Sequence, residues 1–572
     1  MYIRRINIHK DGKDHACWAL VESWRTSRGP RQHVIAYLGE MDESGRLGVK
    51  MAAEGRCDFQ ARLFDDQQPK WVEVNLRAVR TERSFDFGGM WLALELIKRL
   101  GLDQFFQQFI PPGRGKIRWA DLAMVLVIAR FCDPKSELYI AEHFYRHSAL
   151  PFLTGIPADK IYDNRLYRTL DKLLAHKTEL EQHLKERLTS LFDIRYDLLL
   201  YDITSTYFEG QSKKNEQAQR GYSRDQRSDC KQVLIALVVT REGIPLGYEI
   251  FAGNRHDSTT VEEIVTKMEK QYGAADRIWV MDRGMTSDKN IHFLQQNNRR
   301  YIIGTPKSLL KHFEKQLLAK DWQTIQEGIE VKYCPSPSGE ETFILCRSAT
   351  RKEKDQAICE RFKKNIEDGL TKIKQTCDKG RLSDIGVAER RIGRLLQRNT
   401  RAARVFDISI QQDDGGKLKL CWSYRKEVED WLALSNGCYL LRSNIRDWSA
   451  KELWSAYIHL TDAEEAFRIH KSDLALRPIW HYNKERVQAH ILVCFLAFVL
   501  WKCLAQMCKA AGLGNEPRKV VDELKHIKLT EVILPTRNGV EIKLNCVSKP
   551  DAHQKILLQY LKLNLPSRLT NY

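Results

Sequence analysis

Hydrophobic and polar residues change their spacing several times along the chain, and each change marks an expected structural unit. Residues 19–23 and 33–38 are apolar and β-branched runs separated by a Gly29-Pro30 turn signal, which predicts an N-terminal β module over residues 1–75. From residue 85 onward apolar positions recur at intervals of three and four. This spacing predicts helices at residues 89–97, 120–129 and 163–192, and so a helical bundle over residues 85–192.

Strand-like and helical segments then alternate over residues 195–305. Strands are expected at residues 196–208, 232–240, 244–251, 278–281 and 301–305, and helices at residues 259–272 and 287–298. Short connections make the first three strands an antiparallel meander, whereas the later strands return through helices and should be parallel. The predicted fold class is therefore α/β, built on a mixed five-stranded sheet of ribonuclease H-like layout.

The remaining segments complete this core. Residues 306–445 contain two pairs of strand-like segments with a charged helical stretch between them, which predicts a mostly β insertion. A helix is expected from residue 449 to residue 470, begun by a capping box of Ser449 and Glu452. A long apolar helix follows at residues 483–507. The core thus comprises residues 195–305 and 446–510, and residues 511–572 form a tail of mixed character.

Two of the expected strands end in an acid. Asp202 follows the apolar residues Leu198 to Tyr201, and Asp282 follows the apolar residues Ile278 to Met281. An ionised carboxylate is costly to bury unless it is paired or bound to a metal. The first and fourth strands are neighbours in the expected sheet, so the two carboxylates should lie side by side. Carboxylate oxygen is the ligand that hard divalent cations prefer, which indicates a metal site that acts on phosphate.

A third acid, Glu464, lies on the expected helix. Tyr457, Glu464 and Lys471 follow one another at intervals of seven, and Arg468 lies four residues after Glu464. These spacings put a phenol, a carboxylate and two cations on one helix face. The carboxylate suits a metal ion and the cations suit DNA phosphates. Glu465, about 100° around the helix, is the alternative ligand. An ordinary salt-bridged surface helix would show the same stripe.

The amino-acid composition indicates the kind of partner that the protein binds and the cell compartment in which it is expected. Apolar residues make up 43% of the 572 residues, and Lys and Arg exceed Asp and Glu by 92 to 74. The chain is therefore globular, and its positive charge favours a polyanionic partner. None of the 14 cysteines forms a CxxC pair, which indicates reduced thiols in a cytosol. The N-terminus has no signal-peptide pattern, and the longest apolar run is about half a membrane span, so we expect no membrane contact.

Basic residues gather in three connections. The loop at residues 211–231 joins the first two core strands and contains Lys213, Lys214, Arg220, Arg224, Arg227 and Lys231. It is either a clamp on DNA phosphates beside Asp202 or a mobile, solvated hairpin. Basic residues also surround the N-terminal turn, which belongs to a DNA-contacting module or to a solvated hairpin. Arg114, Lys116 and Arg118 precede the second bundle helix, in a DNA-end reader or a scaffold.

These residues carry a family resemblance. The sequence resembles insertion-sequence transposases of the DDE class, in the subgroup marked by the signature Tyr-x2-Arg-x3-Glu-x6-Lys. Tyr457, Glu464 and Lys471 fit the signature in register, but Leu460 stands where its arginine is expected. Further matching runs are Tyr201-Asp202-Ile203-Thr204-Ser205-Thr206, Gly221-Tyr222-Ser223-Arg224-Asp225, Val280-Met281-Asp282-Arg283-Gly284-Met285, Glu464-Glu465-Ala466-Phe467-Arg468, Arg477-Pro478-Ile479 and Ala489-His490-Ile491.

The resemblance implies a cut-and-paste DNA transposase that cleaves element ends and joins their 3′-hydroxyls to target DNA. Asp202, Asp282 and Glu464 would be the catalytic residues and the ligands of two Mg²⁺ ions, with Mn²⁺ able to replace them. Double-stranded DNA would contact Tyr457, Lys471, Arg468, Arg283, Arg224, Lys213 and Lys214. In this family the signature arginine contacts DNA near the cut; in its absence Arg468 or Arg283 would supply the cation.

The resemblance also implies a homodimer on DNA and a place in the prokaryotic cytosol, at the nucleoid. Two other functions use the same residues. One is a ribonuclease H-like nuclease or resolvase that cuts without strand transfer. The other is a DNA-binding regulator without catalysis, which the presence of all three acids disfavours.

Overall fold

The computed structural model describes residues 2–10, 13–26, 29–39, 72–113, 115, 117–273, 277–336, 339–413 and 416–569. The chain forms two compact units, Met1–Thr169 with Cys503–Tyr572, and Leu170–Lys502. Each unit is described here by itself. Arg114 and Lys116 of the expected DNA-end reader, and Arg28 of the N-terminal turn, lie outside the described residues.

The first unit contains two small antiparallel sheets. The N-terminal sheet has the order β1 (Tyr2–Lys10), β2 (Lys13–Thr26) and β3 (Gly29–Gly39), and the two expected strands lie within β2 and β3. The second sheet joins distant parts of the chain. It contains β4 (Arg80–Asp86), β16 (Lys528–Pro535), β17 (Glu541–Val547) and β18 (Arg568–Leu569), in the order β18-β17-β16-β4. The C-terminal tail is thus held to the chain before the bundle by strand pairing.

Helices make up the rest of the first unit. The expected helices at residues 89–97 and 120–129 are α3 (Gly88–Arg99) and α5 (Trp119–Cys132). The expected helix at residues 163–192 is two helices, α9 (Asp163–Leu174) and α10 (Lys177–Phe192). The unit boundary falls within α9, so α10 belongs to the second unit.

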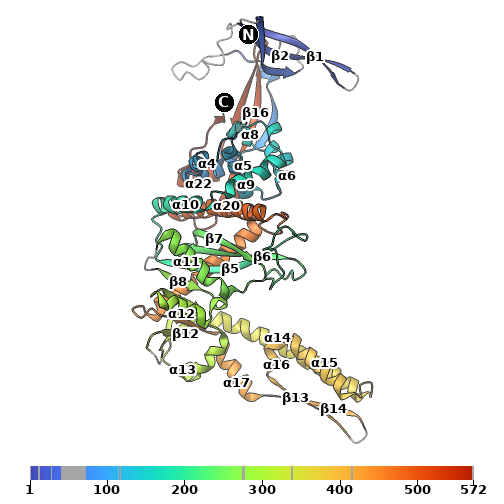
Figure 1. Ribbon diagram of the computed structural model, residues 1–572, viewed down its shortest axis with the longest axis vertical. Helices are drawn as coiled ribbons and strands as arrows, with labels where there is room; N and C mark the ends of the chain where they lie inside the picture. The colour runs from blue at the N-terminus through green and yellow to red at the C-terminus, as the bar shows by residue number, and fades with distance from the viewer. Residues whose placement is uncertain are drawn as a thin grey trace. The chain divides into compact units, whose positions relative to one another are not determined.

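The second unit is built on a mixed sheet, which confirms the α/β fold class. The five expected strands are β5 (Leu198–Tyr207), β6 (Gln232–Thr240), β7 (Pro245–Ala252), β8 (Ile278–Met281) and β9 (Arg300–Gly304). They lie in the order β9-β8-β5-β6-β7. The pairs β5–β6 and β6–β7 are antiparallel, and β5–β8 and β8–β9 are parallel. This order and these directions are the predicted ones (Figure 1).

The number of strands is a correction, because the sheet has nine and not five. Its four further strands come from the insertion: β10 (Gln323–Gln326), β11 (Ile329–Pro335), β12 (Thr342–Ser348) and β15 (Cys438–Ser443). β15 pairs antiparallel with β9, and β12 pairs with β15. Strand β9 would otherwise leave a row of unpaired backbone groups at the sheet edge. The insertion satisfies these groups and is continuous with the core.

The description of residues 306–445 as mostly β is also corrected. Between β12 and β15 lie α14 (Ala349–Asp378), α15 (Ile385–Arg398), α16 (Thr400–Ala403) and α17 (Lys426–Ser435), with the hairpin β13 (Phe406–Gln412) and β14 (Leu418–Tyr424). Figure 1 shows α14 and α15 side by side. Ile366 and Leu370 of α14 pack with Phe406 and Leu420 of the hairpin in a separate apolar cluster. The long charged stretch therefore folds as helices over its own small core.

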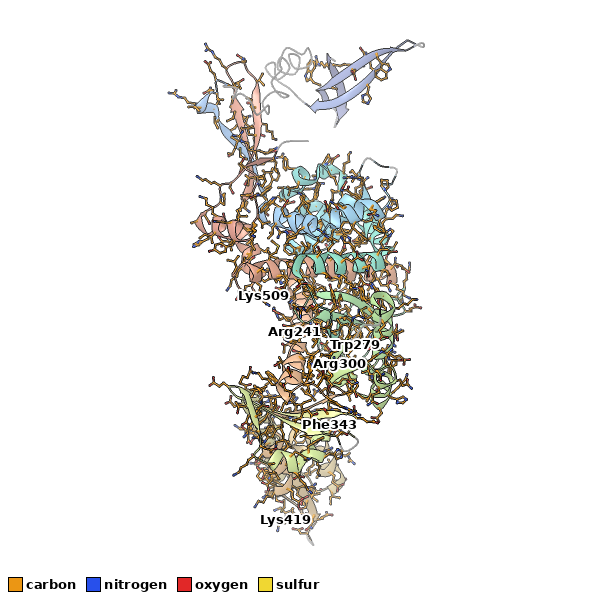
Figure 2. The ribbon with its side chains drawn as sticks, turned by 90° about the vertical axis from the view of Figure 1, so that its left-hand side faces the viewer. Arg241, Trp279, Arg300, Phe343, Lys419 and Lys509 are labelled. Atoms are coloured by element: carbon orange, nitrogen blue, oxygen red, sulfur yellow. The ribbon has the colours of Figure 1, made fainter. Side chains whose placement is uncertain are left out.

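Two helices cover one face of the central sheet. These are α11 (Val261–Tyr272) and α12 (Asp288–Gln296), whose apolar residues pack on alternate strand residues such as Leu199, Tyr201 and Ile203. Trp279 of β8, labelled in Figure 2, is 2% exposed in this cluster. Because neighbouring strand residues point to opposite faces, Asp202 points away from this cluster.

The opposite face meets the helix that carries Glu464. The expected capping box of Ser449 and Glu452 is present at the start of α18 (Ala450–Ile458). One continuous helix to residue 470 was the wrong expectation: α18 ends at Ile458, α19 (Leu460–Arg468) follows, and Ile469–Asp473 is π-helical. Tyr457, Glu464 and Lys471, which follow one another at intervals of seven, therefore do not lie on one regular helix, because the helix is interrupted both before and after Glu464.

The long apolar helix is α20 (Lys484–Ala510). Within the described part of the chain it alone has the length and apolarity to cross a membrane, and 94% of its most apolar stretch is buried. A helix in a protein core passes the same test, so this is weak evidence for a membrane span.

Candidate functional site

The pairing of two strands brings the first two acids together. Asp282 directly follows β8, but Asp202 lies within β5 and does not end that strand as was expected, because β5 continues its pairing with β6 to Tyr207. Tyr201 of β5 pairs with Met281 of β8 in parallel register, so Asp202 and Asp282 occupy adjacent positions on neighbouring strands. Parallel strands place their carboxyl ends at the same edge of a sheet. The backbone N–H of Ile203 donates to Asp202 Oδ1 at 2.8 Å, which fixes the orientation of this carboxylate. The predicted neighbourhood of the two aspartates follows directly from the strand order.

All three acids line one cavity. Asp202, Asp282 and Glu464 border a space of about 560 Å³ within the second unit, and Glu465 does not. Glu465 lies 3.9 Å from Lys502 and 3.4 Å from Arg468 in ion pairs. Helix α19 packs directly on β5, which carries Glu464 to the strand ends. Of the two glutamates, Glu464 and not Glu465 therefore lines the cavity with the two aspartates.

Burial and neighbouring carboxylates raise the pKa values of Asp202 and Glu464. Burial raises the pKa of Asp202 to about 7, and the charges of Asp282 and Glu464 add to this rise, although the Ile203 amide and Arg224 oppose it. Burial also raises the pKa of Glu464, again with a contribution from Asp282. The cavity lining also holds Asp257 and the cations Arg224, Arg283, Lys307 and Arg351, so its formal charges balance.

The three carboxylates Asp202, Asp282 and Glu464 fit a divalent cation by the chemistry of their oxygens. The donor set is carboxylate oxygen, which Mg²⁺ and Mn²⁺ accept readily. Among the described residues, the three acids are not part of a group whose ligand atoms all lie within 4.8 Å of one another. The carboxylates are therefore spread around the cavity and do not converge on one point.

Tyr457 lies beside these acids at the end of α18. Burial and the charge of Asp282 raise the pKa of its phenol, which stays protonated as a hydrogen-bond donor. A Cβ atom at Gly304 would lie 2.4 Å from the Tyr457 hydroxyl oxygen. The glycine that ends β9 thus makes room for this phenol. A neutral buried phenol is poorly suited to act as a nucleophile.

Cations reach the cavity from two connections. Arg224, from the loop after β5, pairs with Asp257, and its backbone N–H donates to Ser205 Oγ at 3.1 Å. Arg283 directly follows Asp282 and also lines the cavity. Leu460, which stands at the position of the signature arginine, is 8% exposed and borders the same space. Arg224 and Arg283 are therefore placed to meet an anion there.

Lys471 does not border this cavity. It lies on the π-helical turn after α19, and its Nζ donates to Asp225 Oδ1 at 2.8 Å. Arg477 pairs with the same carboxylate, which is 4% exposed. These ion pairs connect the basic loop, residues 211–231, to the segment that follows α19. The expected face of Tyr457, Glu464, Arg468 and Lys471 on one helix is corrected in this way.

Three further predicted DNA contacts also lie outside the cavity lining. Arg468 is 62% exposed and forms ion pairs with Glu465 and Asp473. Lys213 and Lys214 lie on the exposed part of the basic loop, with the Lys214 ammonium 5.8 Å from the ring centre of Tyr482. The loop itself is well anchored, because Gln219 and Gln232 exchange backbone hydrogen bonds at 2.9 and 3.1 Å.

Four ionisable residues of the cavity lining were not predicted. Asp257 follows β7, and Lys307, Arg351 and Tyr439 come from the insertion. Asp257 lies in the connection after β7, and an acid shortly after an expected strand was a signal available in the sequence. The insertion residues had no such signal, since nothing local relates residue 351 to residue 202.

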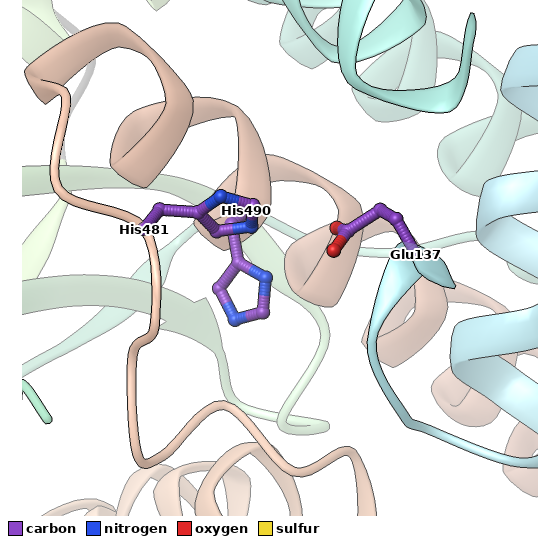
Figure 3. Close-up of side chains that lie close together, drawn as sticks. All are labelled: Glu137, His481 and His490. Carbon is purple, nitrogen blue, oxygen red and sulfur yellow. The ribbon is translucent and has the colours of Figure 1, made fainter. Parts of the chain in front are cut away.

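Two motif runs have a structural role. Ile479 forms a parallel bridge with Phe208, and its backbone N–H donates to Tyr207 O at 2.9 Å. His490 of α20 is 7% exposed and lies 5.3 Å from His481, measured between ring centres (Figure 3). Neither Ile479 nor His490 lines the acidic cavity. They position the chain between α19 and α20 beside the end of β5.

The fold and site define an α/β protein with an acid-lined cavity beside a mixed sheet. The family model described as the transposase DDE domain matches residues 194–500, more than half of the chain. The chain belongs to this family. No curated protein matches it. A cryo-EM structure of a piggyBac transposase synaptic complex with hairpin DNA is 9% identical, with 80% of this chain and 82% of that chain covered. Its TM-score of 0.38 is too low to establish a common fold.

Proposed function

We propose that the protein is a DNA transposase that cleaves the ends of its element and joins their 3′-hydroxyls to target DNA. The observation that carries this proposal is the meeting of Asp202, Asp282 and Glu464 around one cavity in a member of the transposase DDE family. We further propose that it acts as a homodimer on two DNA ends, in the prokaryotic cytosol.

The three carboxylates would hold two divalent ions, Mg²⁺ or Mn²⁺. When bound, these ions supply the Lewis acidity that activates a hydroxyl and stabilises the leaving oxygen at phosphorus. Asp202 suits the shared position, because its pKa responds to both other acids. Arg224 and Arg283 would hold the non-bridging oxygens of the phosphate.

The protonated phenol of Tyr457 would donate a hydrogen bond to a phosphate oxygen and not attack it. The same cavity would therefore serve first a water molecule and then a 3′-hydroxyl as nucleophile, with no covalent protein–DNA intermediate. Lys471 would act indirectly, by holding Asp225 and with it the basic loop.

The test uses the purified full chain with Mg²⁺ and a plasmid that carries the gene with its flanking DNA. We expect cuts at two flanking positions and covalent joining of the excised segment to a second plasmid, detected by sequencing the junctions. A ribonuclease H-like nuclease or resolvase would cut without giving junctions. A DNA-binding regulator would do neither, and Asp202→Asn would then leave every readout unchanged.

A further inference from the structure

A second cavity lies beside the acid-lined one within the same unit. It has a volume of about 760 Å³ and is bordered by α14, α16 and α17 of the insertion. Arg283, Lys307 and Arg351 line both cavities. The two spaces are therefore neighbours that share three cationic side chains. We call the second one the basic groove.

The charge of the basic groove is one-sided. Five cations line it, Arg283, Lys307, Arg351, Lys354 and Arg401, against the single acid Asp355. Asp355 is already occupied, because it accepts from Lys307 Nζ at 2.6 Å and from the backbone N–H of Gly437 at 3.2 Å.

Within the described part of the chain, Lys307 is the one groove cation in an ion pair. The other four face solvent without an acidic partner. Like charges gathered in a concave surface raise the local potential and favour an anion with several charges. A single small anion would neutralise only part of this set.

One of these cations is held in place. Arg351 lies in the first turn of α14, where its backbone N–H donates to the N-cap Ser348 Oγ. Its guanidinium lies 4.9 Å from the ring centre of Tyr439, whose hydroxyl accepts from Trp454 Nε1 at 2.7 Å. An arginine stacked on a fixed aromatic ring loses little freedom when it binds an anion. Arg351 thus presents a fixed charge at the junction of the two cavities.

The floor of the groove is less polar than its rim. Ile358 of α14 and Leu432 of α17 line it and are partly buried. A ligand with regularly placed anionic groups joined by less polar parts matches this surface. The sugar–phosphate backbone of a nucleic acid strand has this chemistry, with phosphates for the cations and sugars for the floor.

We propose that the basic groove binds the DNA backbone next to the phosphate held in the acidic cavity, so that one strand runs across both. This inference rests on the proposed function, which places a DNA phosphate between the three acids. It assigns to the insertion a role in holding DNA during the reaction.

The test compares two triple variants of the full chain. The groove variant combines Arg351→Ala, Lys354→Ala and Arg401→Ala. The control combines Lys364→Ala, Lys372→Ala and Arg394→Ala, which are exposed cations on α14 and α15 outside the groove. Both variants lose the same charge. Equal melting temperatures of the two variants verify that each remains folded.

Binding is measured by fluorescence anisotropy with a labelled duplex of about 40 base pairs from the DNA flanking the gene. We expect the groove variant to bind at least about tenfold more weakly at 0.1 M salt, and its log–log salt slope to fall by about 2 to 3, since each phosphate contact contributes roughly 0.9. The control should stay within about twofold of the wild type. Equal weakening of both variants would overturn the inference.

Failure of this inference is distinguishable from failure of the proposed function. If the wild type cuts and joins DNA while the groove variant binds as the control does, the groove assignment alone is wrong. If the wild type binds through the groove but gives no junctions, the transposase proposal is wrong and the groove assignment stands. A photoreactive residue at Lys354 should also crosslink to DNA, and one at Lys364 should not; the reverse pattern would contradict the groove.

Discussion

The acidic cavity and the basic groove are neighbours, but they are built in different ways. Asp202 lies within β5 where the pairing of that strand with β8 ends, Asp282 directly follows β8, and Asp202 is oriented by a backbone hydrogen bond. The groove cations stand on exposed helix positions at the ends of long side chains. Metal ligands must be placed within tenths of an ångström, whereas phosphate binding needs mainly charge. The difference indicates that the sheet positions the metal ligands precisely, whereas the insertion contributes a positive electrostatic potential.

The largest effect should come from the acids. Asp202→Asn, Asp282→Asn and Glu464→Gln should each lower the rate of strand cleavage on the order of 10³-fold or more at saturating DNA, because a lost metal ligand removes transition-state stabilisation. Glu465→Gln is the matched control and should keep most of the activity. Single-turnover cleavage of labelled plasmid measures both. Normal cleavage by Glu464→Gln with loss in Glu465→Gln would show that the cavity assigns the wrong glutamate.

The next effect concerns the buried carboxylate that anchors the basic loop. Asp225→Ala leaves Lys471 and Arg477 without their shared partner, at side-chain exposures of 11% and 32%. We expect the free energy of unfolding to fall by about 3 kcal/mol, as for other broken buried pairs. In the insertion, Arg425→Ala removes an exposed pair with Asp407 and should cost at most about 1 kcal/mol. Urea denaturation compares the two, and equal losses would contradict the difference in burial.

A smaller effect depends on pH. The folded-state pKa of Asp202 is raised from 3.8 to about 7, so the native state retains this proton where the unfolded state has lost it. Stability therefore falls as pH rises from about 4 to about 7 and stays lowered above that. In EDTA, Asp202→Asn should stabilise the protein by about 2 kcal/mol at pH 8 and by little at pH 4. Thermal melts at both values measure this, and a stabilisation confined to pH 4 would reverse the sign and refute it.

The smallest effect is metal-linked stability. Mn²⁺ at tenfold its dissociation constant should raise the free energy of unfolding of the wild type by about 1.4 kcal/mol. The groove variant should keep this gain, because its acids are intact, whereas Asp202→Asn should lose it. Thermal melts with and without Mn²⁺ provide the measurement. A gain lost in the groove variant instead would place the cation outside the acidic cavity.

The local pattern of apolar residues was enough to predict the strands that carry Asp202 and Asp282, because a buried strand has a short run of apolar residues. The capping box at Ser449 was predictable for the same reason, because it depends on residues three positions apart. The order of the five central strands followed from the lengths of their connections. The sequence alone was therefore enough to predict that the two aspartates lie close together.

Tertiary structure decided the rest. The break at His459 and the π-helical turn at Ile469–Asp473 remove Lys471 from the stripe, and no periodicity signals them. The pairing of β15 with β9 makes the insertion part of the sheet and brings Arg351 and Tyr439 to the acids. Such contacts join residues far apart in the chain, so they depend on which surfaces pack together. The sequence by itself determined the acids and the strands that hold them, and packing decided which cations face them.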